Sequence, residues 1–259
     1  MLLNNKTILI TGANRGIGRA LAEELAKYPV NLLLGMRDVS KYQPIIGGKA
    51  LIIKPLKLDM GSLESIQKDI KAAAVDLKEL DILINNAGQY LAGPLEKQDP
   101  VKLASMVQVN LTGLMQLTAE LMPTLRRKRG KVVNNASIAG YAYFPFNGTY
   151  SATKAGVVAF SESLRREQTD VSVLHLVTPG VATEMMDDVN AAYANNGRPV
   201  NLKTIPADVW ATKVAKAIRK DKTILTPGGA VEVSRILSKG PRFLIDIISR
   251  WIVKKTASS

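Results

Sequence analysis

Short apolar runs typical of buried strands alternate with helical patterns along most of the chain. The strand-like runs occupy residues 6–11, 30–34, 50–58, 80–84, 131–135, 171–177 and 223–226. The helical patterns occupy residues 19–28, 62–77, 100–129, 150–168 and 206–220. A helix between two strands allows them to pair in parallel. The alternation therefore predicts an α/β fold, a doubly wound and mostly parallel seven-stranded sheet with helices on both faces, in one domain over residues 1–259.

Composition removes several kinds of functional site from consideration. The chain has no cysteine and one histidine, so disulfides, thiolate metal sites and multi-histidine metal sites are excluded, and we expect no metal. The one histidine, His175, lies inside the apolar run 171–177. We interpret it as a core-strand residue rather than a catalytic base.

The formal net charge of +13 leaves three interpretations open. A basic surface can attract anionic ligands, attract a membrane or nucleic acid, or serve solubility, which is the commonest case for an enzyme. We find no nucleic-acid-binding module, no secretory leader before the first strand, and no apolar stretch approaching the length of a membrane span. We expect a cytoplasmic protein that binds no nucleic acid.

A glycine-rich turn follows the first predicted strand. Its sequence is Gly12-Ala13-Asn14-Arg15-Gly16-Ile17-Gly18, with the spacing G-x-x-x-G-x-G rather than the common G-x-G-x-x-G. A strand, a glycine-rich turn and a helix N-terminus together form an anion site. Such a turn can be purely structural, but its place at the first strand favours a dinucleotide.

The residues after the second strand give conflicting indications about the cofactor. Asp38 lies 20 residues beyond Gly18 (38 − 18), the spacing of an acid that binds the ribose of NAD. Arg37 and Arg15 carry guanidinium groups suited to the 2′-phosphate of NADP. The pattern alone leaves both cofactors open.

Further polar residues stand where predicted strands end. Asp59 suits either the adenine amino group or a helix cap, and residues 85–88 (NNAG) suit either a turn or the border of a cofactor cleft. Asn110 lies among apolar neighbours in a predicted helix, which indicates either a functional role for its polar side chain or a local kink in the helix. The aromatic loop 138–147 suits either an apolar substrate pocket or core packing.

Tyr150 and Lys154 are four residues apart and share one face of a predicted helix. Such a pair is most often a solvated helix face. In a partly dry site, a close lysine together with a positively charged nicotinamide could bring the tyrosine pKa from about 10 toward 7. Tyr150 would then serve as a general acid and base.

Taken together, these motifs resemble a classical short-chain dehydrogenase/reductase over about residues 5–230. The motifs are TGANRGIG at 11–18, NNAG at 85–88, the isolated Asn110, Ser137, YSATK at 150–154, and Pro179-Gly180. The catalytic residues that the resemblance implies are Asn110, Ser137, Tyr150 and Lys154. The cofactor-binding residues that it implies are Gly12, Asn14, Arg15, Gly16, Ile17, Gly18, Arg37, Asp59, Met60, Asn86, Ala87, Gly88, Tyr150, Lys154, Pro179, Gly180, Val181 and Thr183.

The resemblance also assigns roles to these residues. Ser137 would bond the substrate oxygen, Lys154 would lower the tyrosine pKa and bind the nicotinamide ribose, and Asn110 would hold a relay water. The glycine turn would cradle the pyrophosphate, with Asp59 and Met60 at adenine, Asn86 at the adenosine ribose and Thr183 at the carboxamide.

The family pattern separates the two cofactors at the end of the second strand. Members that prefer NAD tend to carry an acid at the position of Met36, whereas Arg37 and Arg15 match the NADP pattern. We therefore favour NADP(H), with NAD(H) possible. The implied activity interconverts an alcohol and a carbonyl on an apolar small-molecule substrate, in a homodimer or homotetramer. The alternative, a non-catalytic dinucleotide sensor or scaffold, has no need of the intact catalytic residues.

Two C-terminal segments stand apart from the matched motifs. The long stretch 184–205 is predicted to be irregular and to form a substrate lid. Residues 230–259 form a predicted helical extension, and within it 240–255 is amphipathic with basic ends. That segment suits core or dimer packing, or peripheral contact with a membrane.

Overall fold

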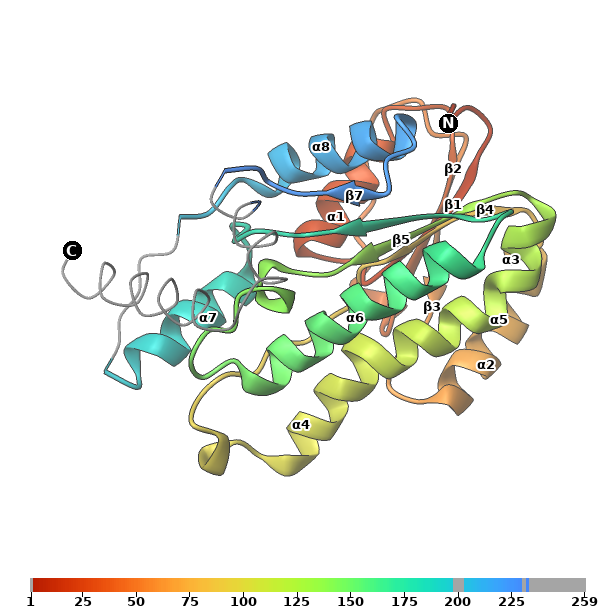
Figure 1. The fold of residues 1–259 in the computed structure, drawn as a ribbon. Coiled ribbons are helices and arrows are strands. Elements are labelled where there is room, and N and C mark those ends of the chain that lie inside the picture. The colour runs from red at the N-terminus through yellow and green to blue at the C-terminus, as the bar shows by residue number, and fades with distance from the viewer. Residues whose placement is uncertain (1, 198–202, 230–231, 233–259) are drawn as a thin grey trace.

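A parallel sheet runs through the middle of the computed structural model, which describes residues 2–197, 203–229 and 232 (Figure 1). Its seven strands are ordered β3-β2-β1-β4-β5-β6-β7, and every neighbouring pair is parallel. The strands are β1 (Thr7–Thr11), β2 (Asn31–Met36), β3 (Ile52–Lys57), β4 (Leu80–Asn85), β5 (Lys131–Asn135), β6 (Ser172–Leu176) and β7 (Ile224–Leu225). The expectation of a doubly wound, Rossmann-like sheet is confirmed.

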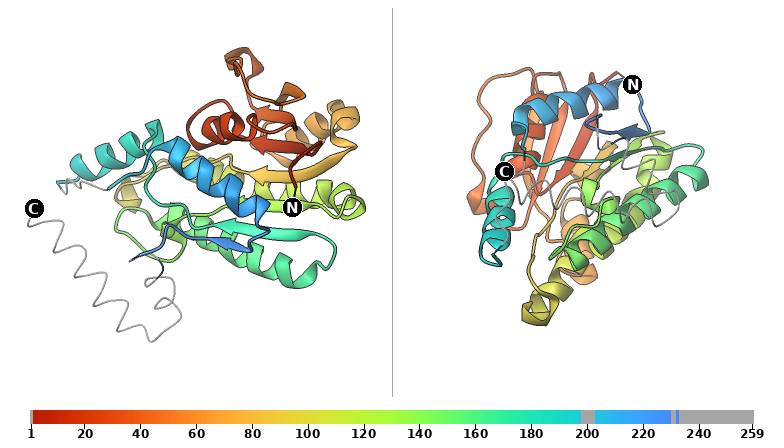
Figure 2. Two further views of the ribbon diagram at one scale, coloured as in Figure 1. Left: turned by 90° about the horizontal axis from the view of Figure 1, so that it is seen from above. Right: turned by 60° about the vertical axis from the view of Figure 1, so that its left-hand side comes forward.

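Helices cover both faces of this sheet. One face carries α1 (Gly16–Leu25) and α8 (Ala207–Arg219). The opposite face carries α2 (Leu63–Ala72), α4 (Pro100–Val107), α5 (Gly113–Arg127) and α6 (Gly148–Glu167), and the short α3 (Ala74–Leu77) follows α2 (Figures 1 and 2). Within β1, Ile8 and Ile10 pack into the first core and Leu9 into the second, as the alternation of side chains along a strand requires. Both faces of the sheet are therefore buried.

The order of the strands creates a crevice between β1 and β4. From β1 the chain builds outward to β2 and β3, then returns to place β4 on the other side of β1. The loops leaving β1 and β4 consequently diverge to opposite faces at the carboxyl edge of the sheet. Ligands of doubly wound sheets bind at such a point.

Two predicted segments differ from the structure. The predicted continuous helix 100–129 is interrupted by a π-helical turn, Gln108–Thr112, between α4 and α5. The predicted irregular stretch 184–205 begins with a regular helix, α7 (Glu184–Ala194), which lies beyond the carboxyl ends of the strands (Figure 1). Its eleven residues fold as a helix because Val189 and Tyr193, four positions apart, bury one face against the domain.

Three further predictions concern the buried histidine, the C-terminal extension and membrane-spanning helices. His175 is buried in β6 as expected, with its ring nitrogens near the Tyr141 hydroxyl (3.1 Å) and a Glu162 carboxylate oxygen (3.5 Å). Apart from Glu232, the predicted extension 230–259 and its amphipathic part 240–255 lie outside the described residues. None of the helices in the described ranges has the length and apolarity needed to cross a membrane.

Candidate active site

The glycine turn between β1 and α1 has a backbone that only glycine adopts without strain. Gly12 and Gly16 have positive φ angles of 64° and 54°. A Cβ on Gly12 would lie 2.9 Å from Ala87 Cα, and one on Gly18 would lie 2.2 Å from the Gly12 carbonyl oxygen. The turn is thus packed directly against the NNAG segment that follows β4.

Helix α1 begins in this turn with its N-terminus open to an anion. Arg15, at the cap position, makes no side-chain cap hydrogen bond, and the first turn contains no acidic residue. The first amide N–H groups of a helix have no partner inside it, and the helix dipole favours negative charge there. Gly12, Arg15 and Gly16 line an adjoining cleft, so this end of the helix is suited to a pyrophosphate.

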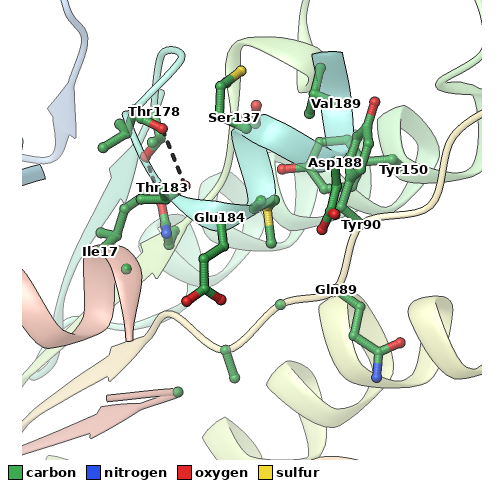
Figure 3. Close-up of a pocket in the computed structure, with 18 of the residues that line it drawn as sticks. Ile17, Gln89, Tyr90, Ser137, Tyr150, Thr178, Thr183, Glu184, Asp188 and Val189 are labelled. Carbon is green, nitrogen blue, oxygen red and sulfur yellow. Dashed lines mark hydrogen bonds between the residues drawn. The ribbon is translucent and has the colours of Figure 1, made fainter. Parts of the chain in front are cut away.

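The cleft has a volume of about 1790 Å³ and extends from the glycine turn to the N-terminal end of α6 (Figure 3). Every site residue predicted from the sequence lines it except Gly18 and Asn110. Gly18 is enclosed by the Gly12 carbonyl and the Asn86 amide, and Asn110 is buried behind the loop that follows β4. The structure therefore brings into one space predicted residues from seven separate stretches of the chain.

At one end of the cleft, carboxylates predicted to meet the adenosine are bonded locally. Asp38 accepts hydrogen bonds from the backbone N–H (3.0 Å) and hydroxyl (2.6 Å) of Ser40, which hold its pKa below the usual range. Asp59 accepts one from the backbone N–H of Gly61 (2.9 Å). Asp38 thus caps the short helical turn Val39–Lys41, whereas α2 is capped by Ser62 and not by Asp59 as one alternative from the sequence required. Both carboxylate residues also line the cleft.

Arg37 and Arg15, the two residues expected at the 2′-phosphate, have different surroundings. Arg37 is exposed at the cleft edge. Arg15 forms an exposed ion pair with Glu184 at the start of α7, with 2.5 Å between nitrogen and oxygen. The pair joins the glycine turn to α7 across the mouth of the cleft.

Asn86 has a structural role that its predicted contact with ribose did not include. Its amide nitrogen donates to the Thr11 carbonyl oxygen (3.0 Å), and its carbonyl oxygen accepts from the Asn135 amide (3.0 Å). Both polar groups of the side chain are therefore used to hold the ends of β1, β4 and β5 together.

Asn135 and Thr178 are residues to which the sequence analysis assigned no role. The Thr178 hydroxyl donates to the Asn135 side-chain oxygen (2.5 Å), and the Lys154 ammonium donates to the Asn135 backbone oxygen (2.8 Å). Asn135 thus connects three strand ends to the lysine of α6. The only signal in the sequence was its position at the end of a predicted strand, beside the already assigned Ser137.

Tyr150, Ser137 and Lys154 meet beside this cluster. Ser137 begins the short helical turn Ile138–Gly140 after β5, and Tyr150 lies in the first turn of α6. The Lys154 nitrogen lies 5.7 Å from the centre of the Tyr150 ring. Figure 3 shows Tyr150 and Ser137 at the same end of the cleft.

Burial is the main influence on the pKa values of this group in the protein without cofactor. Burial raises the pKa of Tyr150 to about 12, although a hydrogen bond with Ser137 acts in the opposite direction. Burial also lowers the pKa of Lys154 to about 8. In the protein without cofactor, desolvation of the phenolate outweighs the effect of its neighbours, and the lowering expected from Lys154 together with a bound nicotinamide stays a prediction.

Asn110 lies in the π-helical turn and supports the loop after β4. Its side-chain oxygen accepts from the Gln89 N–H (2.7 Å), and its amide nitrogen donates to the Gln89 carbonyl oxygen (2.9 Å). Such turns are rare and occur often at functional sites. The helix is therefore irregular at Asn110 and its buried amide has partners, while the functional role of this residue stays a prediction.

The aromatic loop before α6 divides between the cleft and the core. Phe144 lines the cleft, Tyr141 contacts His175, and Tyr143 is 58% exposed to solvent. Phe146 packs edge-on against Tyr193 of α7, with 5.7 Å between ring centres. The loop therefore contributes both to the lining of the cleft and to internal packing, and its role in a substrate pocket stays a prediction.

Comparisons with known proteins agree with this geometry. The chain matches the family model described as short chain dehydrogenase over residues 6–194. It is 32% identical over 214 residues to an uncharacterized oxidoreductase of Staphylococcus saprophyticus, covering 76% of this chain and 86% of the relative. It is 35% identical over 190 residues to an NADP-dependent 3-hydroxy acid dehydrogenase of Schizosaccharomyces pombe, covering 69% and 72%. The structure of an alcohol dehydrogenase from the archaeon Thermococcus sibiricus, complexed with 5-hydroxy-NADP, superposes with a TM-score of 0.74 at 26% identity, covering 86% of this chain and 96% of that one.

Proposed function

The chain belongs to the short chain dehydrogenase family of oxidoreductases, and from this premise we propose that it interconverts an alcohol and a carbonyl with NADP(H) as the cofactor. The single observation that carries the proposal is the meeting of Tyr150, Ser137 and Lys154 at one end of a cleft whose other end is an open helix N-terminus. One end suits proton transfer and the other suits a dinucleotide phosphate.

The residues of the cleft fit NADP(H). The uncapped N-terminus of α1 suits the pyrophosphate, and Arg15 and Arg37 suit a 2′-phosphate. Met36, at the end of β2, supplies no carboxylate for a ribose diol, and the Asp38 carboxylate is engaged by Ser40. The NADP dependence named for the Schizosaccharomyces pombe relative supports the same choice, with NAD(H) as the weaker alternative.

Tyr150 is the residue to which we assign the proton transfer. When bound, NADP(H) would supply a hydride to the carbonyl carbon or accept one from the alcohol carbon. With a pKa of about 12, Tyr150 holds its proton at neutral pH and is ready to donate it to the carbonyl oxygen. In the oxidative direction, the positive charge of the oxidised cofactor would lower that pKa and favour the phenolate.

Ser137 and Lys154 complete the chemistry around the oxygen. We assign to the Ser137 hydroxyl a hydrogen bond donated to the substrate oxygen as negative charge develops there. Lys154, anchored on the Asn135 carbonyl, is mostly protonated at neutral pH and supplies positive charge near the phenol. Asn110 would act on the loop after β4 and, as the family resemblance implies, on a relay water.

The wider organisation follows from the same proposal. We treat residues 1–259 as one oxidoreductase domain, with 184–205 as the substrate lid and 230–259 as a C-terminal extension. A cytoplasmic homodimer or homotetramer suits a family enzyme of this kind. The substrate would be a small apolar carbonyl or alcohol, bounded by the loops 89–95 and 138–147 and by the lid.

The experiment that tests the proposal is NADPH oxidation measured across aldehydes, ketones, steroids, retinoids and sugars. The 3-oxo acids are added because a relative is a 3-hydroxy acid dehydrogenase. We expect turnover of at least one apolar carbonyl, and a loss of about a hundredfold or more in Tyr150→Phe with unchanged NADPH binding. Full activity in Tyr150→Phe would refute the assignment of the proton donor. NADPH binding without turnover of any carbonyl would favour the sensor or scaffold.

A further inference from the structure

A chain of hydrogen bonds joins three segments around the substrate end of the cleft. The Tyr90 hydroxyl donates to the Asn147 side-chain oxygen (2.5 Å). The Asn147 amide donates to the Tyr193 hydroxyl (3.1 Å), which itself donates to the Pro145 carbonyl oxygen (2.7 Å). Tyr90 comes from the loop after β4, Asn147 from the loop before α6, and Tyr193 from α7.

The first residue of this chain also contacts the proposed proton donor. The rings of Tyr90 and Tyr150 meet edge to face, with 5.0 Å between their centres and 73° between their planes. Figure 3 shows Tyr90 and Tyr150 together beneath Asp188 and Val189 of α7. Edge-to-face contacts of aromatic rings have a preferred geometry, so the position of Tyr90 constrains that of Tyr150.

The hydrogen bonds are costly to break because they are buried. Asn147 is 6% exposed and Tyr193 is 7% exposed. A buried polar group that loses its partner is not rescued by water and bears its desolvation penalty. A further backbone hydrogen bond, from the Gly93 N–H to the Phe146 carbonyl oxygen (3.0 Å), joins the same two loops.

We propose that Tyr90 is a positioning residue, which holds the Tyr150 ring through its own ring and anchors α7 over the substrate through its hydroxyl. The proposal rests on the proposed function for its kinetic consequences. The ring and the hydroxyl have separate tasks, since the ring contacts Tyr150 and the hydroxyl reaches α7 only through Asn147. Substitutions can therefore separate them.

Titration of Tyr90 does not interrupt this link near neutral pH. Burial is the main cause that raises its pKa above the ordinary range, and the nearby groups Tyr193, Tyr150 and Asp188 act in the same direction. The hydroxyl thus keeps its proton near neutral pH and remains a donor to Asn147.

Steady-state kinetics on a carbonyl that the enzyme reduces test both tasks. In Tyr90→Phe we expect KM for the carbonyl to rise about five- to tenfold, with kcat within about twofold, because the ring stays and the link to α7 is lost. In Tyr90→Leu we expect kcat to fall at least tenfold as well, because the ring contact is also lost. Tyr143→Phe is the matched control, since Tyr143 is exposed and outside the cleft.

Tyr193→Phe tests the link from its other end. It should raise KM as Tyr90→Phe does, and the double variant should be no worse than either single one, because all three break the same chain. A KM for Tyr90→Phe equal to that of Tyr143→Phe, independent effects in the double variant, or full kcat in Tyr90→Leu would each overturn the proposal.

Hydrogen–deuterium exchange provides a readout that needs no turnover. Amides of residues 184–194 should exchange at least fivefold faster in Tyr90→Phe and Tyr193→Phe than in the wild type and Tyr143→Phe. Equal exchange in all four proteins would overturn the anchoring of α7. A wild-type enzyme that reduced no carbonyl would refute the proposed function, and the exchange measurement would still decide whether Tyr90 anchors α7.

Discussion

The Lys154 ammonium donates a 2.8 Å hydrogen bond to the backbone carbonyl oxygen of Asn135. The side chain of Asn135 in turn bonds Asn86 and Thr178, which follow β4 and β6. The lysine is therefore positioned by the ends of three strands and not only by its own helix.

Removal of the Asn135 side chain should weaken this arrangement. Asn135→Ala leaves the Asn86 oxygen without its donor and the Thr178 hydroxyl without its acceptor, in surroundings largely closed to water. We expect the free energy of unfolding to fall by about 1–3 kcal/mol and NADPH to bind less tightly. Urea unfolding and fluorescence titration measure the two effects. Asn195→Ala, at an exposed position, should change stability by less than about 0.5 kcal/mol, and equal stability of the two variants would contradict the role of Asn135.

The buried ammonium of Lys154 should make stability depend on pH. Its pKa is lowered by burial from 10.5 to about 8, so between these values the unfolded chain holds a proton that the folded protein has released. The free energy of unfolding therefore rises with pH in this window, on the order of 2–3 kcal/mol from pH 8 to 10, and the cost of burying the charge is fully present below pH 8. Tyr150 acts in the opposite direction only above about pH 10.

Urea unfolding of the wild type and Lys154→Met at several pH values between 7 and 10 measures this dependence. Methionine keeps the unbranched stem without a titrating group, so the difference between the two proteins isolates Lys154. That difference should change steadily above pH 8. A constant difference across the range would show that Lys154 keeps its ordinary pKa.

Arg15 and Arg37 should set the preference for NADP(H). Each alanine variant should weaken NADPH binding about tenfold and leave NADH binding nearly unchanged, because only NADPH carries the 2′-phosphate. Dissociation constants from quenching of cofactor fluorescence provide the measurement. Arg127→Ala removes a charge outside the cleft and should affect neither cofactor. If NADPH and NADH lost affinity equally, Arg15 and Arg37 would not bind the 2′-phosphate.

Two glycines with different surroundings provide a test of the glycine turn. In Gly18→Ala the new Cβ would lie 2.2 Å from a backbone oxygen, so we expect stability to fall by about 1–3 kcal/mol or more. In Gly148→Ala the Cβ meets nothing within 4 Å, so stability should stay the same or rise by up to about 1 kcal/mol. Thermal unfolding measures both. A stable Gly18→Ala protein would mean that the turn and NNAG segment can separate.

Local patterns were sufficient for the sheet, the glycine turn and most of the lining of the cleft. Strand and helix periodicities depend on neighbouring residues and can be read from the sequence. Because the carboxyl ends of parallel strands meet at one edge of the sheet, the sequence also predicted that residues 12–18, 85–88 and 179–183 lie close together. The π-helical turn at Asn110 was not predicted, and the sequence offered only a local kink as one of two alternatives. It depends on Gln89, whose backbone is supplied by a different segment.

By itself, the sequence determined the order of the elements and the glycine turn after the first strand, because each of these follows from residues close together in the chain. The proposed catalytic residues came from the family resemblance. Only the tertiary structure decided that Asn135 anchors Lys154, that Tyr90 reaches Tyr193 through Asn147, and that desolvation raises the pKa of Tyr150 in the protein without cofactor. The physical reason is that desolvation and hydrogen bonding depend on which distant segments exclude water from a group, and spacing along the chain does not contain that information.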